Sequence, residues 1–223
     1  MNLFGYLRKK PVPTPEVKFD EKFTKILEKK IPHDAISYVI GLWNKHPFSF
    51  TMPKTRKSCL GNYRLQNGQH TVSVNADLNT YSFLITLIHE IAHQHVAVNQ
   101  KFFKRAAEPH GVEWQTTFSN LMHPLLSMED IFPADILAVL VPHMRKPKAS
   151  SMRDPKLVVA LKKYDANSIE NGESLGKLET GIAFEFNKKT YRKIENRRSR
   201  TLVEDISTKK RYTIPSFAEV KVL

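Results

Sequence analysis

The sequence is poor in cysteine, with Cys59 as the single one among 223 residues. One cysteine excludes an internal disulfide and any zinc ribbon held by pairs of cysteines. Long apolar runs are also missing, since the run at 136–141 (ILAVLV) is far shorter than the roughly 20 residues that cross a bilayer. The first ten residues place their positive charge after a short apolar patch, the reverse of a signal peptide. These absences predict a cytoplasmic protein that makes no use of a membrane.

Positive charge is in excess and unevenly distributed. The formal net charge is +13, from 35 Lys and Arg against 22 Asp and Glu. Residues 145–223 carry 19 of these cations and 10 of the anions, so they account for +9 of the net charge. A strong positive charge favours phosphate-rich partners or acidic membrane surfaces. Charge alone does not distinguish such a protein from a merely basic globular one.

The chain divides into four parts by composition and periodicity. Residues 1–19 form a basic, proline-rich lead, and residues 20–144 combine helical periodicity with short alternating runs. Residues 145–180 are typical of a linker with a short helix, and residues 181–223 alternate like strands. The pattern predicts an α+β protein, with helices and a small antiparallel sheet followed by a small basic β-rich module.

The expected elements follow from the spacing of apolar residues and from turn signals. Helices are expected at 20–31, after Pro32 with His33 or Asp34 as cap, from Asn79 or Thr80 to Val98, from 114 to about 121, and at 133–141. Strands are expected at 48–52, at 58–64 and 70–74 joined through Asn67-Gly68, and at 182–186, 190–194, 201–206, 211–214 and 218–222.

The helix at 80–98 contains the motif His89-Glu90-Ile91-Ala92-His93. Residues four apart share one helix face, so both imidazoles can bind a single metal ion. The helix is otherwise largely apolar, and buried imidazoles and carboxylates need partners. Zinc would lower the pKa of a bound water to about 7, and Glu90 would take its proton as general base. Manganese or cobalt could occupy the same ligands.

A catalytic zinc usually has three protein ligands. The metzincin continuation of the motif requires glycine at 96 and histidine at 99, where this chain has Val96 and Asn99. We favour His110, because 16 residues separate it from His93 and Gly111 lets the backbone pass close to the site. Glu108 and Glu113 are the rival ligands. His95 points to a different helix face and is expected at the surface or behind a ligand, and His143 and His123 are expected in loops or caps.

These residues resemble the SprT-like family, which includes the Spartan proteases that act on DNA–protein crosslinks. The resemblance rests on residues 86–93 (TLIHEIAH), on His110-Gly111-x-x-Trp114, and on the run from 58–64 to Val74-Asn75. It implies a zincin-like fold over roughly 20–145, with His89, His93 and His110 as zinc ligands and Glu90 as catalytic acid and base. Trp114 would pack beneath the site as core.

The sequence departs from that family in its last 80 residues. Many SprT-like proteins continue into a cysteine-based zinc ribbon, whereas this part of the chain has no cysteine. Residues 181–223 are therefore interpreted as a possible metal-free, ribbon-like module. Our hypothesis is that it contacts the DNA backbone without sequence specificity; a charged, solvated face is the alternative. The candidate contacts are Lys188, Lys189, Arg192, Lys193, Arg197, Arg198 and Arg200.

Together these patterns favour a zinc-dependent endopeptidase that cleaves DNA-associated or DNA-crosslinked proteins, placed at the nucleoid if it binds DNA. Two other functions stay open: a nucleic-acid-binding protein whose zinc is structural, and a general cytoplasmic metallopeptidase without DNA dependence. The group that stabilises the oxyanion is not evident, and Tyr63, Tyr81 and His123 are the candidates.

Overall fold

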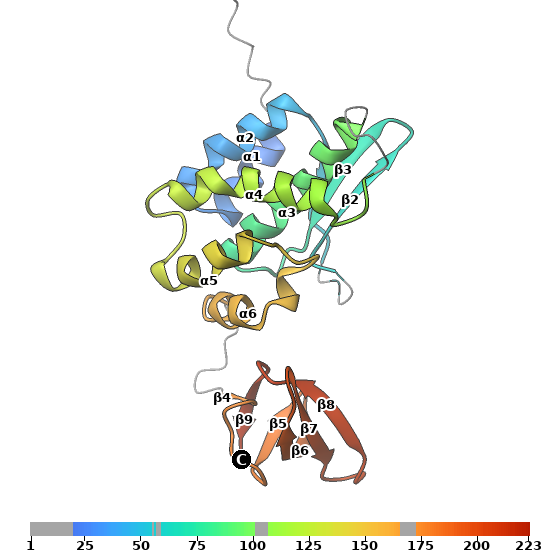
Figure 1. Ribbon diagram of the computed structural model, residues 1–223, viewed down its shortest axis with the longest axis vertical. Helices are drawn as coiled ribbons and strands as arrows, with labels where there is room; N and C mark the ends of the chain where they lie inside the picture. The colour runs from blue at the N-terminus through green and yellow to red at the C-terminus, as the bar shows by residue number, and fades with distance from the viewer. Residues whose placement is uncertain (1–19, 55, 57–58, 101–106, 166–172) are drawn as a thin grey trace, which may run out of the picture.

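The computed structural model describes residues 20–54, 56, 59–100, 107–165 and 173–223. The predicted α+β class is confirmed: the described residues between 20 and 165 contain helices and a three-stranded sheet, and residues 173–223 contain a second sheet (Figure 1). The 1–19 lead falls outside the described residues. No helix among those described is long and apolar enough to span a bilayer.

The first two helices are close to their predicted positions. Helix α1 (Glu21–Lys30) begins at Asp20, whose carboxylate accepts the backbone N–H groups of Lys22 and Phe23. Helix α2 (Ile36–Lys45) follows a 3-10 turn at His33–Ala35. Neither His33 nor Asp34 caps α2 through its side chain, because the 3-10 turn runs directly into the helix and its N-cap residue is Ala35.

The first sheet is mixed rather than antiparallel, which corrects the prediction. Strands β2 (Gly61–Gln66) and β3 (Gln69–Val74) form the expected hairpin, with Asn67 and Gly68 both at positive φ. Strand β1 (Ser49–Thr51) pairs in parallel with the other side of β3. The order β1-β3-β2 leaves β2 at an edge, and this edge strand becomes important at the site.

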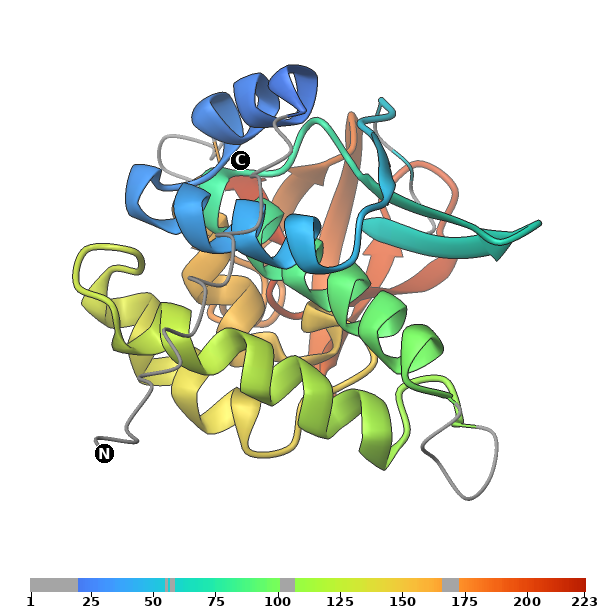
Figure 2. The same cartoon turned by 90° about the horizontal axis from the view of Figure 1, so that it is seen from above.

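Helix α3 (Thr80–Val98) lies between the sheet and α4 (Val112–Ser127) (Figure 2). Asn79 caps it by accepting the N–H groups of Tyr81 and Ser82, as the sequence predicts. Twelve of its 19 residues are buried, so the helix is covered on most sides and its polar residues must find partners inside the fold. Helix α4 continues beyond its predicted end, past Pro124.

Two further helices complete the first part of the structure. Helix α5 (Ala134–Met144) ends three residues later than predicted, and α6 (Pro155–Lys162) lies within the predicted linker. The side chain of Asp154 caps α6, and Pro155 takes the first helical position, where its missing N–H costs nothing. The segment between α5 and α6 is therefore short and fixed at both ends by helices.

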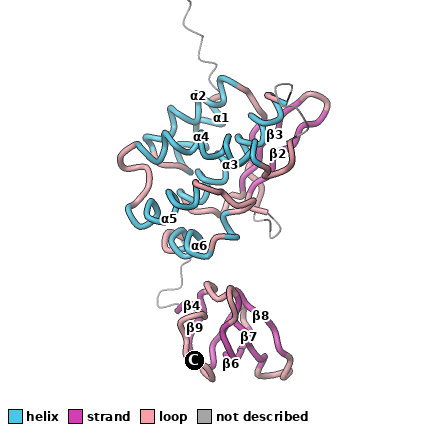
Figure 3. Tube along the Cα trace, viewed as in Figure 1, coloured by secondary structure: helices cyan, strands magenta, loops and turns pink. Residues whose placement is uncertain are grey.

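The C-terminal module is a six-stranded sheet in the order β4-β9-β5-β6-β7-β8. Figure 3 shows its strands in magenta. Its strands are β4 (Glu173–Ser174), β5 (Ala183–Phe186), β6 (Lys189–Asn196), β7 (Arg200–Asp205), β8 (Arg211–Pro215) and β9 (Glu219–Val222). It has its own core of buried residues, Phe184, Val203 and Val220 among them. A zinc ribbon draws its folding energy from the metal, whereas this sheet buries an apolar core.

Candidate metal centre

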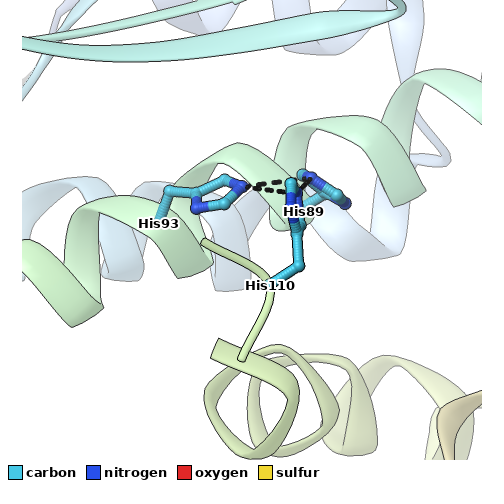
Figure 4. Close-up of side chains that lie close together, drawn as sticks. All are labelled: His89, His93 and His110. Atoms are coloured by element: carbon cyan, nitrogen blue, oxygen red, sulfur yellow. Dashed lines mark hydrogen bonds between the residues drawn. The ribbon is translucent and has the colours of Figure 1, made fainter. Parts of the chain in front are cut away.

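Three histidines converge from two segments of the chain (Figure 4). His89 and His93 are one turn apart on α3, and His110 lies in the turn just before α4. His110 has φ 58°, in the left-handed region, and the N–H of Gly111 closes the turn onto the carbonyl of Glu108 at 2.9 Å. A non-glycine residue in this conformation costs about 1–2 kcal/mol, so the surrounding contacts hold His110 there.

The Nε2 atoms of the three rings form a small triangle. They are 3.2 Å apart between His89 and His110, 3.2 Å between His93 and His89, and 3.1 Å between His93 and His110. Zinc–nitrogen bonds of about 2.0–2.1 Å in a tetrahedral site separate two nitrogens by about 3.3 Å. The triangle therefore fits a single metal ion, with a fourth position left for a non-protein ligand.

Electrostatics keep these imidazoles in the form that binds metals. Burial, reinforced by His93 and His110, lowers the pKa of His89 to about 2. Burial and the neighbouring His110 lower the pKa of His93 to about 4, and burial also lowers that of His110. Neutral rings with nitrogens directed at one another present lone pairs to a common point, where a cation is the stabilising partner.

Glu90 is 5% exposed and lies between the histidines on α3 and the edge strand β2. Burial raises its pKa to about 8, opposed by the charge of Arg56 and by the backbone N–H of Tyr63. A Cβ on Gly61 would stand 2.6 Å from Oε1 of Glu90. The strand can approach the carboxyl group this closely only because residue 61 has no side chain.

Trp114 forms the support beneath the histidines, as the resemblance implied. It is 1% exposed, and its ring centroid lies 4.5 Å from that of His89, 5.4 Å from His93 and 4.7 Å from His110. Its Nε1 donates to the carbonyl of His89 at 3.4 Å. One rigid ring thus touches all three candidate ligands and restrains their orientation.

The centre opens into a cavity of about 380 Å³. Residues from the start of β2, including Gly61 and Tyr63, line it together with His89, Glu90, His93 and His110. A further group comes from the end of α5 and the segment after it: His143, Lys148, Ala149, Ser150 and Ser151. Substrate-sized space therefore adjoins the histidines and the glutamate.

The structure separates the candidates that the sequence left open. Within the described residues, His89, His93 and His110 are the one group of metal-binding side chains brought together, and neither Glu108 nor Glu113 joins them. His95 is 7% exposed and its ring packs against His46, so it is neither at the surface nor beside the triangle. Of the oxyanion candidates, Tyr63 lines the cavity, whereas Tyr81 and His123 do not.

Two residues at the cavity, Gly61 and His143, and one near Glu90, Arg56, carried no signal that the sequence analysis used. Gly61 precedes no turn and lies in a strand, so its role in making room for Glu90 appears only in three dimensions. His143 was expected in a loop or cap, but it is 6% exposed in the last turn of α5 and bonds to Asp154. Arg56 lies near Glu90 and donates to Asn75 and Ser73.

The seven basic candidates of the C-terminal module differ in exposure. Lys188, Lys189, Arg192 and Arg198 are exposed, and Arg197 and Arg200 are exposed but bonded to Glu195 and Thr213. For Lys193 the structure corrects the prediction of an exposed contact residue. It is 2% exposed, and its ammonium donates to the carbonyls of Gly176 and Leu178. Burial lowers its pKa, and it is not available to a phosphate.

The fold and the site together define an α+β domain with a cluster of three histidines that could hold a metal ion. Residues 23–131 match the model of the SprT-like family, which confirms the resemblance seen in the sequence. The match supports the assignment of this part of the chain to the SprT-like family, and the family suggests a function of the metallopeptidase type. No curated protein and no solved structure gives a significant match to the chain.

Proposed function

We propose that the protein is a zinc-dependent endopeptidase with a zincin-like active site. The observation that carries the proposal is the Nε2 triangle of His89, His93 and His110 with Glu90 beside it in one cavity. Three ligands and an adjoining open space are typical of catalytic zinc, whereas structural zinc usually has four protein ligands. Glu90 is not one of the three ligands, and a structural site would have no use for it.

Zinc held by the three histidines supplies Lewis acidity that lowers the pKa of water to about 7. Glu90 removes a proton from the attacking water and carries it to the amine that leaves, so one carboxyl serves as base and then as acid. Burial favours its protonated form, while Arg56 and the N–H of Tyr63 favour the carboxylate. These opposing influences suit a group that must exchange a proton in both directions.

The free edge of β2 supports a peptide substrate. Strand β2 pairs with β3 on one side and with no other described strand, and its first residues line the cavity. An extended peptide could add to this edge through main-chain hydrogen bonds, which bind without demanding a particular sequence. We therefore expect an extended segment of a protein to be the substrate.

We further propose that the substrates are DNA-bound or DNA-crosslinked proteins. The support is the net charge of +9 in residues 145–223 and the exposed Lys188, Lys189, Arg192 and Arg198 of the C-terminal module. Phosphate contacts from such side chains hold DNA without reading its sequence. The alternative is a general metallopeptidase in which this charge has no part in recruitment.

The test combines metal analysis with cleavage of a DNA-bound protein, with and without DNA. We expect one zinc per chain and cleavage that DNA stimulates. The Glu90→Gln variant should bind zinc normally and lose at least about 100-fold in cleavage rate. Zinc binding with equal behaviour of Glu90→Gln and wild type would establish a structural site instead. Cleavage that DNA does not affect would favour the general peptidase.

A further inference from the structure

Part of the cavity comes from residues beyond the SprT-like match. The match ends at residue 131, whereas His143, Lys148 and the segment Ala149 to Ser151 also line the cavity of the metal centre. The match to the family therefore assigns these residues no role. His143 is the one among them with an imidazole side chain, which carries two ring nitrogens for hydrogen bonding.

The His143 ring is held in one orientation. It lies in the last turn of α5, its side chain is 2% exposed, and its Nδ1 is 2.8 Å from Oδ2 of Asp154. The other carboxylate oxygen of Asp154 accepts the N–H groups of Lys156 and Leu157 and so caps α6. Both oxygens of Asp154 are thus engaged, and the carboxylate cannot turn away from the imidazole.

This bond leaves Nε2 of His143 for another partner. The carboxylate places a proton on Nδ1, and no group among the described residues bonds to Nε2. If His143 served only to link α5 to α6, the hydrogen bond from Nδ1 to Asp154 would suffice, and the ring would not need to line the cavity. Orientation of an imidazole by a carboxylate, which leaves the second nitrogen for the substrate, is the arrangement that catalytic histidines use, and the His143 side chain lines the cavity.

We propose that His143 donates a hydrogen bond from Nε2–H to the oxygen of the scissile carbonyl, with Asp154 as a positioning residue. The inference rests on the proposed peptidase function. When the water oxygen bonds to the carbonyl carbon, the π electron pair moves onto the carbonyl oxygen and Glu90 holds the proton that water loses. The negative charge on that oxygen strengthens its hydrogen bond from Nε2–H, while Nδ1–H remains on Asp154.

Two other cavity side chains are less suited than His143 to bind the carbonyl oxygen of the substrate. Tyr63 lines the cavity, but its hydroxyl is 2.8 Å from Nδ1 of His70 and is already engaged. Lys148 is exposed and its ammonium donates to the carbonyl of Arg153 at 3.0 Å, so it is less constrained in orientation than the buried His143 ring. Among the cavity residues, His143 therefore combines a ring nitrogen without a hydrogen-bond partner in the described part of the chain and a carboxylate that orients the ring.

The test uses the full chain loaded with cobalt(II), whose absorbance reports on the metal site, and phenylphosphonate as a tetrahedral anion. We expect His143→Ala to weaken phenylphosphonate binding by about 10-fold or more, since it removes a charge-assisted hydrogen bond. His143→Gln keeps a donor toward Asp154 and serves if the alanine variant fails to fold. Asp154→Asn keeps the α6 cap and should weaken binding less.

His123→Ala is the matched control, because His123 is exposed and does not line the cavity. It should bind cobalt and phenylphosphonate as wild type does. In the cleavage assay, His143→Gln should lower kcat by about 100-fold or more with KM nearly unchanged. If His143 had only a structural role, its replacement would lower the melting temperature and would not lower kcat selectively over KM.

The outcomes separate the two proposals. Cobalt uptake by wild type, with equal phenylphosphonate affinity in the His143 variants, overturns the role of His143 and leaves the peptidase proposal intact. If the wild-type protein does not bind cobalt, the proposed function and the role of His143 are overturned together. Weaker phenylphosphonate binding in the His143 variants, with cobalt content unchanged, establishes the inference.

Discussion

The backbone of Gly61 lies directly against the carboxyl group of Glu90. A Cβ at residue 61 would stand 2.6 Å from Oε1 of Glu90 and 2.7 Å from Cγ2 of Thr86, closer than real contacts allow. Thr86 and Glu90 are one turn apart on α3, so a side chain at 61 must push β2 and the helix apart. The edge strand and the proposed general base are therefore placed by the same close approach.

Gly61→Ala tests this relationship. The methyl group should displace Glu90 and lower the cleavage rate by about 10-fold or more, because small misplacements of a general base are costly. Overpacking should also destabilise the fold by about 1–3 kcal/mol. The cleavage rate, zinc content and urea unfolding measure these effects, and zinc content should stay at the wild-type value.

Gly41→Ala is the matched control for that variant. Gly41 lies in α2, where a Cβ would have nothing within 4 Å. The change should leave cleavage unaltered and raise stability by about 0.5–1 kcal/mol, since alanine is the better helix former. Wild-type cleavage by Gly61→Ala would show that β2 does not restrain Glu90.

The second prediction concerns the third ligand. His110→Ala should weaken zinc binding by at least about 100-fold, because it removes one corner of the Nε2 triangle. Glu113→Ala should bind zinc as wild type does, since Glu113 lies outside the group of metal-binding side chains. Competition with a chromogenic chelator measures both affinities. The reverse result would assign the site two histidines and a glutamate.

The third prediction concerns the support beneath the site. Trp114→Ala should destabilise the fold by about 3–5 kcal/mol, as expected for a large side chain that is 1% exposed. Zinc affinity should fall as well, because the ring touches all three histidines. Urea unfolding with and without zinc provides the measurement. Val112→Ala, at a residue that is 72% exposed, should change stability by less than about 0.5 kcal/mol.

The fourth prediction separates the basic residues of the C-terminal module. If Lys188, Lys189 and Arg192 contact phosphates, their replacement by alanine should lower the salt dependence of DNA binding. Each lost contact should reduce the slope of log affinity against log salt by about 0.9. Fluorescence anisotropy at several salt concentrations provides the measurement, and absence of DNA binding by wild type at low salt would rule out the DNA proposal.

Lys193→Met gives the contrast within the same strand. Its ammonium bonds to two backbone carbonyls inside the module, so its loss should destabilise the fold by about 1–3 kcal/mol. The salt slope of DNA binding should not change. A reduced slope without loss of stability would mean that Lys193 reaches DNA after all.

Local patterns predicted much of the first part of the structure. The helix at 80–98 and its cap at Asn79 follow from apolar spacing and one side chain, and the Asn67-Gly68 hairpin follows from two residues that tolerate positive φ. The 3-10 turn before α2 and the parallel pairing of β1 were not predicted. Neither depends on the local pattern alone, because strand direction is set by the path of the chain between strands.

The sequence by itself determined the pair His89 and His93, since helical periodicity places residues four apart on one face. It also indicated His110, because the 16 residues between His93 and His110 are enough for the chain to reverse and come back to the site. Only the tertiary structure placed Gly61 against Glu90 and joined His143 to Asp154, because these contacts depend on how whole elements pack. The burial of Lys193 was decided in the same way: the pairing of β6 with β7 shifts register between Lys193 and Glu195, and register determines which face of a sheet each side chain occupies.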